Sequence, residues 1–541
     1  MRSPAIEVSE RRAGVAILAA FTLVSIVFTG QYRPFANPNE LSRLQAVYAF
    51  VEDGTFRIDD AVLRFGSHED RSLSAGHLYS NKAPGLTFAA IPVYRLLRVF
   101  FPRPTTPFDA IFVLLRILVV TPLCVLALAR FHSRLLTRGA RAPALVTGAL
   151  AFGTPYLFYS RSFFSHAWTA ALLLLALDLI QQAEEDGSRR RVGLLVFGAG
   201  LLAGWAAISE YPLAILCALL LARSASRRKL GRAGRAGLFA LGAALPLVLL
   251  LWYDTVCFGS PFVLSSAREA SPRYAELARQ GAFGFQAPSL KVAVAYLLHP
   301  ARGVLIYSPF FLWAAAGFVR WRRARERRAD WAFCLAAAAL FFFAMTAYPN
   351  WHGGWSLGNR YLLPLLFPVG FALPYALGSP ISRWGFAAAA VFSAGAHAIL
   401  SSTWTHYPAE LFWPAGNGAL WFLSHGWAAP GILGDPPGWA IAALTISAVA
   451  AAAALVPSLA AAGLPYARTG LAVATGLAAL ALLLFAAPRP DFFMAVWRAE
   501  IYSGLSGRDP SREKLRALLA TASTPAERRR AEQSWRFYGP R

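Results

Sequence analysis

The feature that most constrains the fold is a series of apolar stretches, each long enough to cross a bilayer, that recurs along almost the whole chain of 541 residues. A membrane core needs about 20 apolar residues per helix. The sequence therefore predicts an all-α polytopic membrane protein with about 13 transmembrane helices. The windows lie at 14–29, 109–129, 143–160, 163–183, 192–209, 211–223, 236–256, 303–319, 331–348, 361–378, 384–402, 438–460 and 468–487.

Composition excludes the other large classes of protein. Hydrophobic residues make up 57% of the chain and charged residues only 15%, where about 25% charged is usual for soluble domains. A soluble multidomain protein, a disordered chain and a coiled coil are excluded. The four cysteines lie far apart, so neither a disulfide framework nor a metal spacing follows from them.

The net charge of +24 is interpreted as a topology signal. Lys and Arg are retained in cytoplasmic loops, and the strongest basic runs fall in the connections at 130–141, 189–191, 223–235 and 320–328. All four share one side if the apolar segment 85–101 does not span. We therefore expect a bacterial-type inner membrane protein with a cytoplasmic N-terminus and an extracytoplasmic C-terminus, and no nucleic-acid partner.

This topology divides the chain into four parts. They are an N-terminal segment with the first transmembrane helix (1–29), a first extracytoplasmic loop (30–108), the remaining transmembrane helices and outer loops (109–487), and a short extracytoplasmic tail (488–541). The outer segments hold nearly all the unusual polar residues, which predicts a working site on the extracytoplasmic face.

The first outer loop opens with a helix signal. Asn37 offers an acceptor to the free amides of the first turn, and Glu40 faces the positive helix end. Apolar residues then recur at helical spacing until Gly54. The pattern predicts an amphipathic helix lying on the membrane surface. On spacing alone, Glu40 could equally be a capping acid without a further role.

The same loop carries a family resemblance. The stretches Asn39-Glu40-Leu41-Ser42-Arg43, Glu52-Asp53-Gly54-Thr55-Phe56 and Tyr79-Ser80-Asn81-Lys82-Ala83-Pro84-Gly85 resemble the first outer loop of the GT-C glycosyltransferases. The match is best with the branch that contains protein O-mannosyltransferases and the aminoarabinose transferase of lipid A. The resemblance implies a GT-C-like bundle with interfacial helices in the first outer loop.

It also implies an activity. Such enzymes pass a sugar from a polyprenyl monophosphate to an acceptor on the outer face, with inversion, and Glu40 would be the general base. The chain departs from the family pattern at Asn39, where relatives have an Asp, and near Arg161 and His166, where many have a second-loop Asp. His166 is the nearest polar equivalent there. The implied partners are the polyprenyl-phosphate sugar, a glycan, lipid or protein acceptor, and membrane lipids.

The chemistry requires similar groups independently of the family. A departing lipid phosphate gains negative charge, so fixed cations must lie beside it, and Lys82, Arg302 and Arg360 all stand at outer membrane ends. A carboxylate must also take the proton of the acceptor hydroxyl. Glu40 is the first choice for this base, and Glu69 or Asp70 is the reserve.

Aromatic residues in the outer segments supply candidate contacts to the sugar or the lipid: Tyr79, Trp351, His352 and Trp355. Trp351 and Trp355 could instead be ordinary aromatic-belt residues, and Lys82 could extend its amine from an interfacial helix to water. No metal site is assigned, because His68-Glu69-Asp70 has metal-ligand residue types without metal-ligand spacing; a divalent cation is left open as cofactor. Arg116 falls inside a span and is expected to face a partner or a cavity.

Two other functions stay open at this stage. One is a membrane transporter or lipid flippase, although transporters commonly contain internal repeats and polar groups near the midplane, and no repeat is visible in this chain. The other is a non-catalytic subunit of envelope assembly, which the Asn39 departure keeps in consideration.

Overall fold

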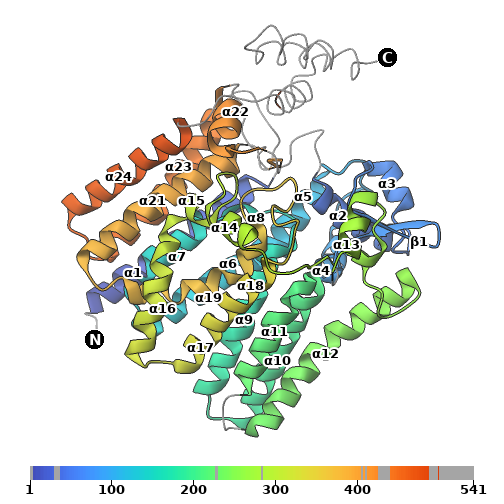
Figure 1. Ribbon diagram of the computed structural model, residues 1–541, viewed down its shortest axis with the longest axis horizontal. Coiled ribbons are helices and arrows are strands. Elements are labelled where there is room, and N and C mark those ends of the chain that lie inside the picture. The colour runs from blue at the N-terminus through green and yellow to red at the C-terminus, as the bar shows by residue number, and fades with distance from the viewer. Residues whose placement is uncertain are drawn as a thin grey trace.

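The computed structural model describes residues 4–29, 37–225, 230–281, 284–403, 406–408, 411–424, 439–485 and 498. In these ranges the chain is a helical bundle, and its only strands form one short hairpin at the edge (Figure 1). The expected C-terminal tail at 488–541 lies outside the described residues apart from Arg498.

The chain is a multi-pass membrane protein. Among the described residues, six helical segments are long and apolar enough to cross a membrane: Ala110–Thr137, Arg189–Ser209, Gly231–Phe258, Arg328–Met345, Pro380–Ser402 and Ala467–Leu484. The count of about 13 stays a prediction. Several other windows form broken helices, because proline removes a backbone donor and interrupts the ladder. Window 361–378, for example, holds Pro364, Pro368 and Pro374 and splits into three short pieces.

In the first half of the bundle, the backbones of helices α10 (Arg189–Ser209) and α12 (Gly231–Phe258) approach each other very closely at two glycines. A Cβ added at Gly200 would lie 2.0 Å from the Phe239 carbonyl oxygen, and one at Gly242 would lie 2.1 Å from that of Phe197. Small residues allow this approach of two backbones. The elements are α1 (Pro4–Val27), α5 (Ala110–Leu115), η1 (Arg116–Val120), α6 (Thr121–Thr137), α7 (Pro143–Phe152), α8 (Tyr156–Tyr159), α9 (Ser165–Glu185), α10 (Arg189–Ser209), η2 (Tyr211–Leu213), α11 (Ala214–Ser224) and α12 (Gly231–Phe258).

The second half packs against the first through α21 and α23, which contact α7, and α23 also contacts α1. Its elements are η3 (Ser265–Arg268), α13 (Pro272–Arg279), α14 (Leu290–Leu298), α15 (Val304–Tyr307), η4 (Pro309–Leu312), α16 (Trp313–Ala324), α17 (Arg328–Ala336), η5 (Ala337–Phe341), α18 (Phe342–Met345), η6 (Arg360–Leu365), α19 (Leu366–Gly370), α20 (Leu373–Ala376), α21 (Pro380–Ser402), η7 (Pro414–Leu420), α22 (Trp421–Ser424), α23 (Trp439–Ala461) and α24 (Tyr466–Phe485).

The first loop folds into α2 (Pro38–Glu52), α3 (Asp59–Phe65), β1 (Arg71–Ser74), β2 (His77–Ser80) and α4 (Gly85–Leu97). The predicted helix start is confirmed, because the Asn37 side chain caps α2 and accepts from the Asn39 amide at 2.9 Å. The helix α4 has 13 residues, or about 20 Å of length. That is too short for a bilayer core, in keeping with a segment that does not span.

The expectation that α2 lies on a surface is wrong. Every residue from Asn39 to Ala49 is buried within the protein. The polar residues of the helix find internal partners: Ser42 donates to the Asp70 carbonyl at 2.7 Å, and Gln45 donates to the Gly66 carbonyl at 2.9 Å. Because these partners replace water, the helix does not need an exposed polar face.

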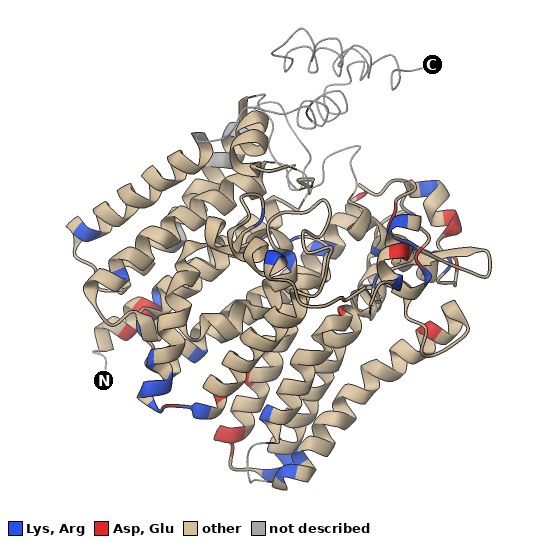
Figure 2. Ribbon diagram, in the orientation of Figure 1, with Lys and Arg blue, Asp and Glu red and all other residues tan. Residues whose placement is uncertain are grey.

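Charged side chains gather at two ends of the bundle (Figure 2). We call the end formed by residues 37–109, 259–289 and 347–360 the loop end. We call the end formed by the connections 138–142, 186–188 and 324–328 the arginine end. The basic connections meet there, since Arg223 bonds both Glu184 and Asp330, and Arg138 bonds Asp330 at 3.0 Å.

Candidate functional site

A polar cavity of about 560 Å³ opens at the loop end. It collects residues from four separate stretches of chain, namely the start of α2 with the hairpin, the connection between α12 and α14, the connection between α18 and η6 with the start of η6, and the connection between α21 and η7. The lining residues are Asn37, Pro38, Asn39, Glu69, Asp70, Asn81, Lys82, Glu269, Arg273, Tyr274, Tyr348, Asn350, His352, Gly353, Gly354, Trp355, Arg360, Tyr361 and His406.

Lys82 and Asp70 face the cavity as a pair. Asp70 directly precedes β1 and Lys82 follows β2, so the pairing of Arg71 with Ser80 brings both residues to the open end of the hairpin. The Lys82 amine lies 3.0 Å from Asp70 Oδ2. Burial alone would raise the pKa of Asp70, but the charge and hydrogen bond of Lys82 lower it below its usual value. Asp70 is therefore an anion at neutral pH, and much of the Lys82 charge is already neutralised.

Arg360 is the strongest anion-binding candidate in the cavity. Its side chain is buried, and its guanidinium lies over the rings of Phe164 and Tyr361 at 5.1 and 5.2 Å. No described carboxylate lies within 4 Å of it, and its Nε has no hydrogen-bond partner among the described residues. Asp70 acts on this charge only from beyond that distance and is already paired with Lys82, so the cavity keeps positive charge available for an anionic ligand at this position.

A tight glycine turn holds Arg360 in place. Gly353 and Gly354 have φ of +70° and +68°, where an L side chain is strained. A Cβ on Gly353 would also stand 3.0 Å from Arg360 Nε. Glycine is therefore required for the turn and for the space beside the guanidinium.

Glu269 and Arg273 complete the charged lining, and neither is among the site residues predicted from the sequence. Both come from the connection between α12 and α14, which an added bridge between Ser72 and Glu269 ties to the hairpin. The signal was available: this connection lies on the predicted outer side and carries Arg268-Glu269 and Arg273-Tyr274 between two apolar windows.

Glu40 lies behind the cavity wall and is not among the lining residues. Its Oε1 is 3.2 Å from Arg116 Nε and accepts from the Phe163 amide. Arg116 thus has the partner that its place in a span predicts. Glu40 still affects His406, which lines the cavity. Burial lowers the pKa of His406 to about 4, and the negative charge of Glu40 opposes this lowering.

Asn39 also lines the cavity, and Arg43 holds its amide oxygen. Arg43 further donates to Ser165 Oγ at 2.7 Å and lies 3.4 Å from Glu210 Oε1. His166 Nδ1 is 3.6 Å from the same Glu210 oxygen. Asn39 is therefore held by an arginine that also contacts the Glu210 carboxylate.

Arg302 is placed differently from the other predicted cations. Its guanidinium donates to backbone carbonyls of Ser356 at 2.8 Å, Gly354 at 2.7 Å and Tyr407 at 3.0 Å. It does not line the polar cavity. Arg161 is likewise buried against the Ser401 carbonyl and the ring of Phe28. Both arginines fasten backbone segments together.

The predicted aromatic contacts divide into two groups. His352 and Trp355 line the polar cavity, and Trp355 is 43% exposed. Burial lowers the pKa of His352 to about 4, so it is neutral at pH 7. Tyr79 packs against Phe258 at 5.6 Å and Trp351 packs against His299 at 5.1 Å, and neither lines the cavity.

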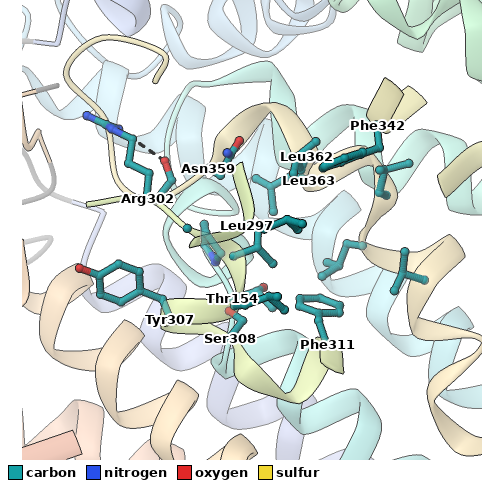
Figure 3. A pocket seen from close by; sticks show the side chains of 18 of the residues that line it. Thr154, Leu297, Arg302, Tyr307, Ser308, Phe311, Phe342, Asn359, Leu362 and Leu363 are labelled. Atoms are coloured by element: carbon teal, nitrogen blue, oxygen red, sulfur yellow. Dashed lines mark hydrogen bonds between the residues drawn. The ribbon is translucent and has the colours of Figure 1, made fainter. Parts of the chain in front are cut away.

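A second cavity of about 410 Å³ is almost entirely apolar. Figure 3 shows Leu297, Phe311 and Phe342 around it, with Arg302 and Asn359 on one side. Asn359 is 5% exposed, and neither atom of its amide has a hydrogen-bond partner among the described residues. Because Asn359 lines this cavity and the next residue, Arg360, lines the polar one, a single loop borders both.

Metal-ligating side chains are not grouped in the described ranges. No three His, Cys, Asp or Glu residues there are close enough to hold an ion.

Comparisons with known proteins give a likeness in fold alone. No protein-family model and no curated protein matches the chain. The structures it resembles include ArnT from Cupriavidus metallidurans (16% identity, TM-score 0.44, covering 86% of this chain and 76% of that one). Others are the oligosaccharyltransferase AglB from Archaeoglobus fulgidus (13%, 0.44, 97% and 60%) and the arabinosyltransferase EmbB from Mycobacterium smegmatis (12%, 0.43, 87% and 41%).

The likeness concerns the arrangement of the helices. At these identities the likeness assigns no residue, substrate or activity to the chain.

Proposed function

We propose that the chain is an integral-membrane glycosyltransferase. It would move a sugar from a polyprenyl-phosphate donor to a hydroxyl of a glycan, lipid or protein acceptor on the extracytoplasmic face, with inversion at the anomeric carbon. The observation that carries the proposal is Arg360, a buried guanidinium that lines a cavity and has no carboxylate within 4 Å in the described part of the chain.

The two cavities together fit an amphiphilic donor. The polar cavity of about 560 Å³ has room for a sugar and its phosphate, and the apolar cavity of about 410 Å³ suits the first units of a polyprenyl chain. The loop holding Asn359 and Arg360 borders both. A phosphate at Arg360 would therefore stand where the polar and apolar parts of such a molecule join.

The chemistry follows from the charges. As the bond between the anomeric carbon and phosphate oxygen breaks, the departing phosphate gains negative charge, and Arg360 and Arg273 are placed to stabilise it. Lys82 contributes less, because Asp70 already pairs with it. Asp70 and Glu69 reach the cavity, whereas Glu40 supports its wall.

The orientation rests on the distribution of arginine. The connections at the arginine end carry Arg138, Arg141 and Arg327, and the adjoining end of α16 carries Arg320 and Arg322. Basic loops stay in the cytoplasm. This distribution supports the proposal that the loop end, and with it the polar cavity, faces outside.

The test uses purified protein in nanodiscs. Undecaprenyl phosphate is titrated while tryptophan fluorescence is followed, since Trp355 lines the cavity, and transfer from radiolabelled polyprenyl-phosphate sugars to an envelope fraction is measured in parallel. We expect Arg360→Gln to weaken undecaprenyl phosphate binding at least tenfold and to lower transfer about 100-fold. Arg279→Gln is the matched control, because Arg279 is an exposed arginine at the end of α13 that does not line the cavity.

Unchanged binding in Arg360→Gln would overturn the phosphate assignment. Absence of transfer by the wild-type protein with every donor, together with movement of labelled lipid across vesicle membranes, would overturn the enzyme and favour a flippase.

A further inference from the structure

Glu269 stands apart from the other acids of the loop end by its place and its partners. It follows η3 in the connection between α12 and α14, and the amide of Ala270 donates to the Arg71 carbonyl at 2.8 Å. This contact and the bridge between Ser72 and Glu269 fix the residue against the hairpin. The backbone at Glu269 is therefore held in place although the residue lies in a connection, and its side chain lines the polar cavity.

The Glu269 carboxylate has a single oriented donor. Asn81 Nδ2 lies 3.0 Å from Oε1 and 2.8 Å from Oε2. No described Lys, Arg or His lies within 4 Å of it. One amide leaves most of the lone pairs of a carboxylate unused, so Glu269 keeps acceptor capacity toward the cavity.

The other carboxylates of the loop end are less suited to accept a proton in the cavity. Asp70 is paired with Lys82 at 3.0 Å, and Glu40 is paired with Arg116 at 3.2 Å behind the wall. Glu69 lines the cavity but is exposed to solvent. A carboxylate that already binds a cation is a weaker proton acceptor, because the cation stabilises its ionised form.

The surroundings of Glu269 also set its basicity. Burial raises its pKa to about 7, while Lys82 and the Asn81 hydrogen bond lower it and Asp70 raises it. Arg273 and Tyr348 line the same cavity. A general base works best when its pKa is near the working pH.

Taking these observations together, and resting on the proposed glycosyl transfer, we propose that Glu269 is the general base that accepts the proton of the acceptor hydroxyl. The acceptor oxygen forms its bond to the anomeric carbon while the bond from that carbon to the phosphate oxygen breaks. The bonding electron pair leaves with the polyprenyl monophosphate, and the hydroxyl proton moves to the Glu269 carboxylate. Asn81 is the positioning residue, because it orients both carboxylate oxygens.

The experiment compares Glu269→Gln, Glu269→Asp and a matched control, Glu276→Gln. Glu276 lies on the adjacent helix α13, is exposed, pairs with Arg279 at 2.7 Å and does not line the cavity. We expect Glu269→Gln to lower the transfer rate at least 100-fold and to leave undecaprenyl phosphate affinity within twofold of wild type. Glu269→Asp should restore part of the rate, and Glu276→Gln should match wild type.

The pH profile separates a base from a merely structural group. A base must be ionised, so wild-type transfer should rise with pH through an apparent pKa near 7, and residual transfer by Glu269→Gln should lack this rise. A Glu269→Gln variant with the wild-type rate and the wild-type rise would overturn the proposal while leaving the glycosyltransferase intact. A wild-type protein that transfers nothing would overturn both.

Discussion

At the arginine end, the Asp330 carboxylate lies 3.0 Å from Arg138 and 2.6 Å from Arg223, and Asp178 likewise serves Arg130 and Arg134. At the loop end, the Arg360 guanidinium borders a cavity and lacks any described carboxylate within 4 Å. Buried arginines at the arginine end therefore have close carboxylate partners, whereas Arg360 at the loop end has none within that distance among the described residues. Buried charges that satisfy one another fix helices, whereas a buried charge without its partner creates a place for a ligand.

The largest expected effect comes from breaking the ion pairs of Asp330 at the arginine end. Replacing Asp330 by Asn leaves Arg138 and Arg223 buried without their shared counterion. Breaking such a pair costs about 3–5 kcal/mol, so we expect a clear loss of thermal stability, read by differential scanning fluorimetry in detergent. The control is Glu7→Gln, because the Glu7–Arg11 pair is exposed and pairs of that kind contribute about 0.5 kcal/mol. Equal melting temperatures for both variants would contradict the contrast.

The second effect is a loss of transfer activity when Arg360 at the loop end is replaced. Removing Arg360 takes away a charge that serves a ligand, so activity should fall while the fold stays intact. We expect Arg360→Gln to lower transfer about 100-fold, the usual cost of losing one transition-state donor. Its melting temperature in the absence of ligand should stay within a few degrees of wild type. A collapse of stability to the level of Asp330→Asn would show that Arg360 is structural.

Arg302 tests whether charge or geometry matters at the border of the two cavities. Lysine keeps the charge but cannot reach the carbonyls of Gly354, Ser356 and Tyr407 together. We expect Arg302→Lys to lose about 2 kcal/mol of stability, since hydrogen bonds to charged groups contribute about 1.5–3 kcal/mol each. Undecaprenyl phosphate binding should weaken at the same time because the loop that bears Arg360 loosens. Full retention of both would return Arg302 to the role of a simple phosphate cation.

The smallest effect is a pH dependence of stability. The pKa of Glu269 is raised in the folded protein to about 7 from an ordinary value near 4.5. The folded state therefore binds more protons than the unfolded state between these values, and its stability falls as pH rises through that window. We expect wild type to lose melting temperature between pH 5 and pH 8 relative to Glu269→Gln. Parallel curves for the two proteins would contradict a raised pKa.

The sequence predicted the regions of the site better than its members. Of the motif from Tyr79 to Lys82 only Asn81 and Lys82 line the polar cavity, and the segment from Trp351 to Arg360 lines it through residues 352–355 and Arg360. Periodicity could not show that α2 is buried on every side. That outcome depends on partners such as Asp70 and Gly66, which join it only in the folded chain.

Pairing was the part that sequence could not supply. Glu40 is predicted in the first outer loop, and Arg302 and Arg360 are predicted at the outer ends of spans. In the folded chain the first pairs with Arg116, the second binds carbonyls and only the third faces the polar cavity. Whether a charged side chain finds a partner depends on residues that are distant in the sequence and close only in the folded protein. Glu269 was missed for a related reason, since its importance comes from Asn81, which is 188 residues away.

The buried helix α2 has a consequence for how the chain is made. Asn37 donates to the Trp355 carbonyl at 3.1 Å, 318 residues later, and Arg43 uses Ser165 and Glu210. A ribosome therefore delivers α2 long before most of these partners exist, and contacts of such sequence separation form late. The contacts of α2 at the loop end are therefore complete only once the chain has been made as far as Trp355.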